Sequence, residues 1–126
     1  MDKLSAAFRD LRKVGFYARQ NYQCCSSCAG SALATQAEQD MDRGRRPSGC
    51  VFYTRQDAAN LRRDRDRGVG TLFLGFGPLS TMRHGEVGLP IESVGDAVMA
   101  ALAANGIDAV WNRDPQRKIE VRVSSL

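Results

Sequence analysis

The residues of this chain that are best suited to chemistry are three cysteines within five positions, Cys24, Cys25 and Cys28. The Cys25-x-x-Cys28 spacing is that of a zinc knuckle and also that of a thioredoxin-type redox pair. If the pair serves either purpose, its side chains should lie within about 4–5 Å of each other at the start of a helix. The three thiols are therefore candidate metal or redox groups, and zinc is the candidate cofactor.

Three interpretations of these thiols remain open. A structural zinc site needs further ligands, which Cys50 or His84, the only histidine, could supply alongside the cluster. A redox pair needs its first thiol at a helix N-terminus, where the helix dipole lowers the thiol pKa. The plainest alternative is that the thiols are small buried apolar groups. For Cys50 we predict a free thiol packed near the strand edge.

Four arginines, a Gln-Asp pair and the single tryptophan are weaker candidates for a contact surface. Arginine clusters in loop-like sequence can contact phosphate or an acidic partner, although charge runs are usually solvated. A carboxylate after a strand can be a ligand or a base, but it more commonly caps the next turn. A tryptophan beside a turn can anchor a partner, although core packing is the commoner use. These candidate partner-binding residues are Arg45, Arg46, Arg62, Arg63, Gln56, Asp57 and Trp111.

Apolar periodicity predicts an α+β fold, and the length predicts a single domain over residues 1–126. Amphipathic helices are expected over residues 4–14, 29–41 and 93–105. We expect an antiparallel sheet of about four strands with the helices packed mainly on one face. The predicted strands are 50–54, 71–76, 107–111 and 118–123.

Three further segments carry weaker signals. Residues 16–22 suit a short strand or extended arm after the glycine stop at Gly15, with a continuous helix as the rival. Residues 56–67 could begin as a helical turn, but they become a run of Arg and Asp. Residues 79–91 have no period, and we expect them to form a long ordered loop.

The composition is that of an ordinary globular protein with a basic surface. Hydrophobic residues make up 43% and charged residues 25% of the chain, and the formal net charge is +4. The charged first helix argues against a signal peptide, and no apolar run approaches the roughly 20 residues that span a bilayer. We therefore expect a cytoplasmic protein with no membrane partner, whose thiols are reduced at rest.

Several short motifs, taken together, resemble one family. They are Gly15-Phe16, Ala18-Arg19, Asn21-Tyr22, Cys24-Cys25-x-x-Cys28, Gly49-x-Val51-Phe52, Gln56-Asp57 and Leu72-x-Leu74-x-Phe76-Gly77, followed by Leu102, Gly106, Trp111 and Ile119. The chain resembles an uncharacterised bacterial family, a domain of unknown function, with an Ala-Arg-x-Asn-Phe/Tyr-x-Cys-Cys-x-x-Cys motif. The resemblance covers nearly the whole chain, and it implies no activity.

The chain departs from the pattern of that family at four places. The family has histidine where this chain has Thr54, and glycine directly after the third cysteine, where this chain has Ala29. The family's Trp-Asp-Gly turn is Trp111-Asn112-Arg113 here. Family members carry tyrosine at the position of Cys50, so a shared zinc site should not depend on that thiol. A site that used the histidine would be lost in this chain.

The function expected from these features is that of a non-enzymatic intracellular binding or regulatory protein. Its contact surface would include the cysteine loop and the arginine loops, and a protein is the favoured partner. Nucleic acid is the weaker candidate, because no aromatic residues interleave with the arginines to stack on bases. One alternative is a zinc- or thiol-dependent enzyme or redox sensor. Another, suggested only by size and charge, is a small mobile-element inhibitor of a bacterial protein or nucleoprotein complex.

Overall fold

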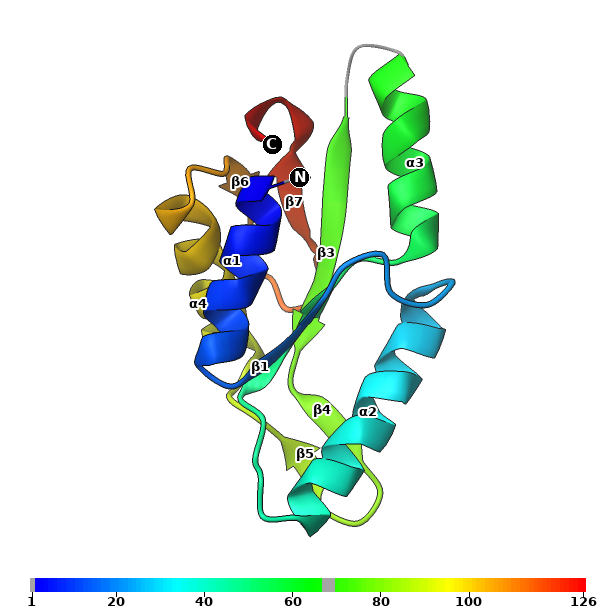
Figure 1. The fold of residues 1–126 in the computed structure, drawn as a ribbon, viewed down its shortest axis with the longest axis vertical. Helices are drawn as coiled ribbons and strands as arrows, with labels where there is room; N and C mark the ends of the chain where they lie inside the picture. The colour runs from blue at the N-terminus through cyan, green and yellow to red at the C-terminus, as the bar shows by residue number, and fades with distance from the viewer. Residues whose placement is uncertain (1, 67–69) are drawn as a thin grey trace.

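The computed structural model describes residues 2–66 and 70–126 (Figure 1). Its helices are α1 (Asp2–Lys13), α2 (Ser26–Asp42), α3 (Arg55–Asp66) and α4 (Ile91–Ala104). Its strands are β1 (Phe16–Arg19), β2 (Gly49–Phe52), β3 (Thr71–Gly77), β4 (Leu79–Thr81), β5 (Gly85–Val87), β6 (Ala109–Val110) and β7 (Ile119–Arg122), and the chain ends in a 3₁₀ turn, Val123–Ser125.

The main sheet has five strands in the order β1-β2-β3-β7-β6, and β4 pairs with β5 in a separate hairpin. β1 and β2 are parallel, whereas the other neighbours in the sheet are antiparallel. The predicted α+β class is confirmed, but the prediction of an antiparallel sheet of four strands is wrong. The difference comes from β1, a short edge strand that joins β2 through the crossover helix α2, as parallel pairing requires.

Helices cover both faces of this sheet, so the expectation that they pack mainly on one face is also wrong. Side chains alternate along β2: Val51 enters the core cluster with α1 and α4, whereas Cys50 and Phe52 enter a second cluster with α2. Figure 1 shows α1 and α4 on one side of the sheet and α2 on the other. The apolar stripe of α2, formed by Ala29, Leu33 and Ala37, packs against the face of the sheet that Cys50 and Phe52 line.

Two further segments differ from the sequence prediction. Residues 79–91 contain the β4–β5 hairpin, which packs against α2, rather than one continuous loop. Residues 55–66 are helical throughout, although only Ala58 and Leu61 of α3 join the core. This helix is mostly charged and solvated, so it carried little periodic signal. The expected Arg and Asp run ends at residue 67, which lies outside the described residues.

The parallel pair β1 and β2 decides where the cysteines lie. The loop after β1 leads into α2 and holds the three thiols, and the turn after β2 leads into α3. The carboxyl ends of neighbouring parallel strands lie at the same edge of a sheet, so these two loops and the first turns of two helices meet there. None of the described helices is both long enough and apolar enough to cross a membrane.

Candidate metal centre

The sulfur atoms of Cys24, Cys25 and Cys28 form one cluster, in which all three lie within 4.8 Å of one another. The Sγ atoms of Cys24 and Cys25 are 3.5 Å apart. Cys25 is the N-cap residue of α2, and Cys28 lies in the first turn of that helix. The prediction that Cys25 and Cys28 meet at the start of the second helix is therefore confirmed, and α2 begins three residues earlier than expected.

The loop before the cysteines is fixed by hydrogen bonds to the segment that starts α3. The backbone N–H of Arg55 donates to the Gln23 carbonyl at 3.0 Å, and that of Gln56 donates to the Cys24 carbonyl at 3.2 Å. Asn21 and Gln23 have φ angles of +50° and +60°. A non-glycine residue adopts this left-handed conformation at a cost, which the hydrogen bonds to α3 offset. The thiols thus sit on a preformed loop.

Asp57 and Thr54 cap the first turn of α3 beside this loop. One Asp57 carboxylate oxygen accepts hydrogen bonds from the Thr54 backbone N–H and hydroxyl, both at 2.9 Å, and the Asp57 N–H donates to the Thr54 hydroxyl at 3.3 Å. This reciprocal pair is a capping box. Asp57 therefore serves the capping use that was weighed against a role as ligand or base. Thr54, which stands where the similar family has histidine, is buried, and its hydroxyl forms the hydrogen bonds of the cap.

Lys118 brings a positive charge from the far end of the chain to the same place. Its ammonium nitrogen donates to the Ser26 hydroxyl at 2.9 Å and lies 3.7 Å from a carboxylate oxygen of Asp57. Ser26 is the first residue of α2, directly after the N-cap Cys25. Neither Lys118 nor Ser26 was found by sequence reasoning, because a lysine at the start of an alternating strand carries no motif.

The two ends of the Cys-x-x-Cys motif differ in acidity. The pKa of Cys25 is lowered, first because the backbone N–H of Cys28 favours a thiolate there, and then by the thiols of Cys24 and Cys28. The pKa of Cys28 is raised to about 11, because its thiol donates toward Cys24 and Cys25 and because further negative charge beside them is unfavourable. Cys25 thus ionises more readily than Cys28, as expected for an N-cap thiol.

The cluster has the donor set that a thiophilic metal requires. Thiolates about 2.3 Å from a tetrahedral zinc ion are about 3.8 Å from each other. The sulfur–sulfur separations, from 3.5 Å up to the limit of 4.8 Å, bracket this value. Within residues 2–66 and 70–126, no further cysteine, histidine or carboxylate joins the group. A tetrahedral zinc ion held by these three cysteines would need one further ligand.

The two residues considered as additional ligands lie elsewhere. Cys50 is a free, buried thiol on β2, as predicted, although β2 lies between β1 and β3 and is an inner strand. Burial raises the pKa of Cys50 to about 12. His84 pairs with Asp42, whose carboxylate oxygen lies 2.9 Å from its Nε2. Neither residue belongs to the cluster.

The other sequence candidates do not gather at one site. Arg45 and Arg46 are exposed after the C-terminal end of α2, whose 17 residues span about 26 Å. Arg62 and Arg63 are exposed on α3 rather than in a loop, and Gln56 contributes its backbone N–H beside Cys24. The cysteine loop and Arg45–Arg46 are therefore separated by the length of a helix.

Trp111 packs within the fold. Its ring lies 5.0 Å from that of Phe76 in an edge-on arrangement, and its indole N–H donates to the Asp114 carbonyl at 3.0 Å. The ring also fills the space where a Cβ of Gly95 would be, 2.3 Å away. Trp111 is therefore a partly buried residue that packs against the core directly after β6.

The amino-acid sequence matches one known protein family. The family described as "Domain of unknown function (DUF6891)" matches residues 1–124. A search of curated proteins found no match, and a search of solved structures found none either.

Proposed function

Because the chain belongs to this family of unknown function, we propose a function from the cysteine loop: the protein binds Zn²⁺ through Cys24, Cys25 and Cys28 and uses the metal-ordered loop to contact a protein partner. The observation that supports this proposal is the meeting of three sulfur atoms within 4.8 Å on a loop held by α3. Soft thiolate ligands select zinc and other thiophilic ions over calcium and magnesium.

The helix ends and the lysine around the cysteine loop favour the thiolate form of the cysteines, which is the form that binds Zn²⁺. Thiols must lose their protons to become ligands, so metal uptake is coupled to thiolate formation. The N-terminal ends of α2 and α3 both meet the loop, and helix N-termini carry partial positive charge. Three thiolates and Zn²⁺ together carry one negative charge, and the Lys118 ammonium beside Ser26 partly offsets it.

The proposed role is binding rather than catalysis. The carboxylate nearest the loop, Asp57, is committed to the α3 cap and to Lys118. The zinc would fix the exposed sulfur-bearing turn in one conformation, and water or a group of the partner would supply its fourth ligand. In this proposal the partner is a protein, and Gln56 at the edge of the loop is part of its contact surface.

Metal content in matched variants tests the zinc proposal. Protein purified and then dialysed against a slight excess of Zn²⁺ should hold one zinc per chain, measured by plasma mass spectrometry. Cys28→Ser should lose that zinc, because only two thiolates remain. Cys50→Ser is the control: it should cost about 1–2 kcal/mol of stability from burying a hydroxyl and retain full zinc. If Cys28→Ser held as much zinc as the wild-type protein, the proposal would be wrong.

A second candidate function, thiol–disulfide exchange, has its own supporting observation. Cys25 is the N-cap of α2 and Cys28 follows in the first turn, which is the arrangement of a nucleophilic and a resolving thiol. In that reaction the Cys25 thiolate attacks a disulfide substrate, forms a mixed disulfide and releases the first substrate thiolate. The Cys28 thiolate then attacks Cys25 in the mixed disulfide, which forms a Cys25–Cys28 disulfide and releases the second substrate thiolate. Single-turnover reduction of a disulfide substrate by reduced, metal-free protein, abolished by Cys25→Ser, would favour this function over zinc binding.

A further inference from the structure

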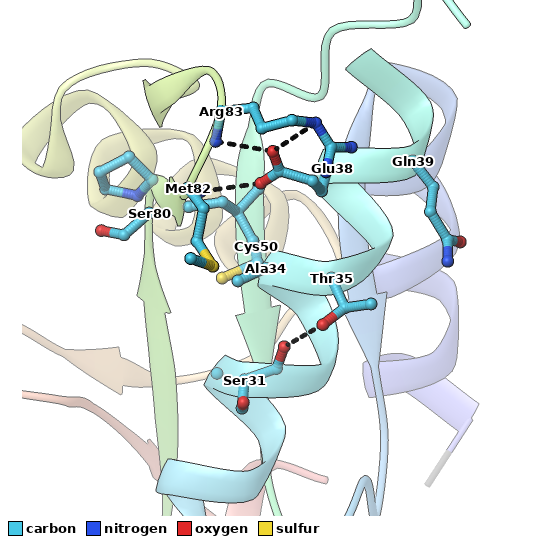
Figure 2. A pocket seen from close by; sticks show the side chains of 12 residues that line it. Ser31, Ala34, Thr35, Glu38, Gln39, Cys50, Ser80, Met82 and Arg83 are labelled. Atoms are coloured by element: carbon cyan, nitrogen blue, oxygen red, sulfur yellow. Dashed lines mark hydrogen bonds and ion pairs between the residues drawn. The ribbon is translucent and has the colours of Figure 1, made fainter. Parts of the chain in front are cut away.

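A pocket of about 750 Å³ lies between α2 and the β4–β5 hairpin (Figure 2). Buried Cys50 and Leu79 face it from β2 and β4, and Ala34 faces it from α2. The hydroxyl-bearing residues Ser31 and Thr35 stand along the helix side. The volume lies within the range of about 300–1,000 Å³ that small-molecule sites occupy.

Gly30 keeps the helix side of this pocket hollow. It lies within α2 and also lines the pocket, and a Cβ built there would meet nothing within 4 Å. Glycine inside a helix costs roughly 0.5–1 kcal/mol relative to alanine. Within residues 2–66 and 70–126, nothing lies close enough to Gly30 to require glycine there, so the close approach of something outside the chain is the remaining structural use of the missing side chain.

The opposite wall is held in place by ion pairs and hydrogen bonds. The Glu38 carboxylate accepts the backbone N–H groups of Met82 and Arg83 at 2.8 and 2.7 Å, and the Arg83 Nε lies 3.4 Å from it. Arg83 and His84 also pair with Asp42. The hairpin turn is thus clamped to α2 at one end, and the pocket exists before any ligand binds.

The lining indicates the charge of the ligand. Glu38 and Arg83, the charged residues at the pocket, neutralise each other. Burial keeps the Cys50 thiol protonated, because its pKa is raised to about 12. Met82 is 97% exposed at the rim, where its flexible apolar side chain can close over a bound molecule. A ligand that is mostly apolar and carries uncharged polar groups would match the residues that line this pocket.

We propose that this pocket binds a small, uncharged, largely apolar molecule, with its polar groups toward the hydroxyls of Ser31 and Thr35. The pocket is lined by the α2-facing side of the sheet at Cys50 and by α2 from Gly30 onward, and none of the three proposed zinc ligands lines it. The inference is therefore independent of the zinc proposal.

Titration with N-phenyl-1-naphthylamine, a neutral apolar fluorophore, tests this inference on the intact protein. The wild-type protein should bind one probe per chain and raise its fluorescence in a saturable way. Gly30→Leu places a side chain in the pocket and should weaken binding by at least about tenfold. Gly30→Ala adds only a methyl group to the same helix position and should bind nearly as well as the wild-type protein. Circular dichroism should show that both variants are folded, because both replace a helix-interior glycine with a better helix former.

Backbone and methyl NMR spectra supply a second measurement that does not depend on a variant. Saturating probe should shift the signals of Ala34, Leu79 and Met82, and should leave the signals of the cysteine loop unchanged. The inference is overturned if the folded wild-type protein shows no saturable binding. It is also overturned if Gly30→Leu binds the probe undiminished, or if the shifts map to a surface elsewhere.

Discussion

Lys118 and Ser26 are 92 residues apart in the chain, and the Lys118 ammonium donates to the Ser26 hydroxyl at 2.9 Å. This contact joins the start of β7 to the start of α2, where Cys25 and Cys28 hold their sulfur atoms close to that of Cys24. A cation is thereby placed beside the cluster that would carry a net negative charge in the proposed zinc complex. The position of β7 in the sheet therefore places a positive charge beside the proposed zinc ligands.

Replacing Lys118 should weaken zinc binding without preventing it. Lys118→Met keeps the length of the side chain and removes the charge, so the affinity for Zn²⁺ should fall a few-fold, or by about 0.5–1 kcal/mol, for a partly exposed and screened charge. The difference from the wild-type protein should shrink as salt rises. Arg117→Met, which removes a neighbouring positive charge that pairs with Asp114, is the control. Equal losses in the two variants would mean that overall charge, and not the position of Lys118, is responsible.

The capping box at the start of α3 should contribute measurably to stability. Thr54→Val preserves the volume of the buried side chain and removes the hydroxyl that bonds to Asp57, so urea unfolding should show a loss of about 1–2 kcal/mol. Thr54→Ser retains both hydrogen bonds and loses only a methyl group, and its first turn should stay capped. Faster amide exchange at Arg55 and Gln56 in the valine variant alone would show that the cap holds the cysteine loop.

The pairing of Arg83 and His84, in the β4–β5 hairpin turn, with Asp42 of α2 forms a clamp that should weaken in acid. The pKa of Asp42 is lowered, first because it accepts a hydrogen bond from His84 and then because of Arg83. A carboxyl group whose folded pKa is lowered stabilises the fold above its unfolded pKa of about 3.9, and this contribution is lost as the pH falls through the lower folded value. The free energy of unfolding of the wild-type protein should therefore fall more steeply below about pH 4 than that of Asp42→Asn. Parallel pH profiles for the two proteins would contradict the clamp.

Two glycines within helices should respond in opposite ways to alanine. Gly95→Ala places a methyl group 2.3 Å from the Trp111 ring, so it should cost about 1–3 kcal/mol of stability through overpacking. Gly30→Ala meets nothing within 4 Å and should stabilise the protein by up to about 1 kcal/mol. Thermal unfolding of the two variants measures both effects, and a stabilised Gly95→Ala would show that Trp111 does not pack as described.

The sequence alone was sufficient for features that depend on neighbouring residues. The Cys-x-x-Cys spacing predicted that Cys25 and Cys28 meet, because one helical turn separates them and a helix follows. Asp57 was named as a candidate for a contact surface with capping as the commoner alternative, and its carboxylate caps the turn after the strand. The alternation of Ile119 and Val121 against charged residues predicted β7.

Features that depend on contacts between distant segments could not be predicted in the same way. The parallel pairing of Phe16 with Gly49 requires the crossover through α2, and no local pattern reports it. Lys118 reaches Ser26 only because β7 lies next to β3 in the sheet, and no local pattern predicts that strand order. The conformations of Asn21 and Gln23 are set by hydrogen bonding of the loop to the start of α3, and neither position carries the glycine that would have marked a left-handed turn.

X-ray absorption at the zinc edge tests the central claim most directly. Zinc-loaded protein should show three sulfur neighbours at about 2.3 Å and one lighter nitrogen or oxygen neighbour, because Cys24, Cys25 and Cys28 supply the thiolates and the fourth position is open. The same spectrum should be obtained for Cys50→Ser. A zinc ion surrounded only by nitrogen and oxygen, or one whose sulfur count is unchanged in Cys28→Ser, would contradict the account.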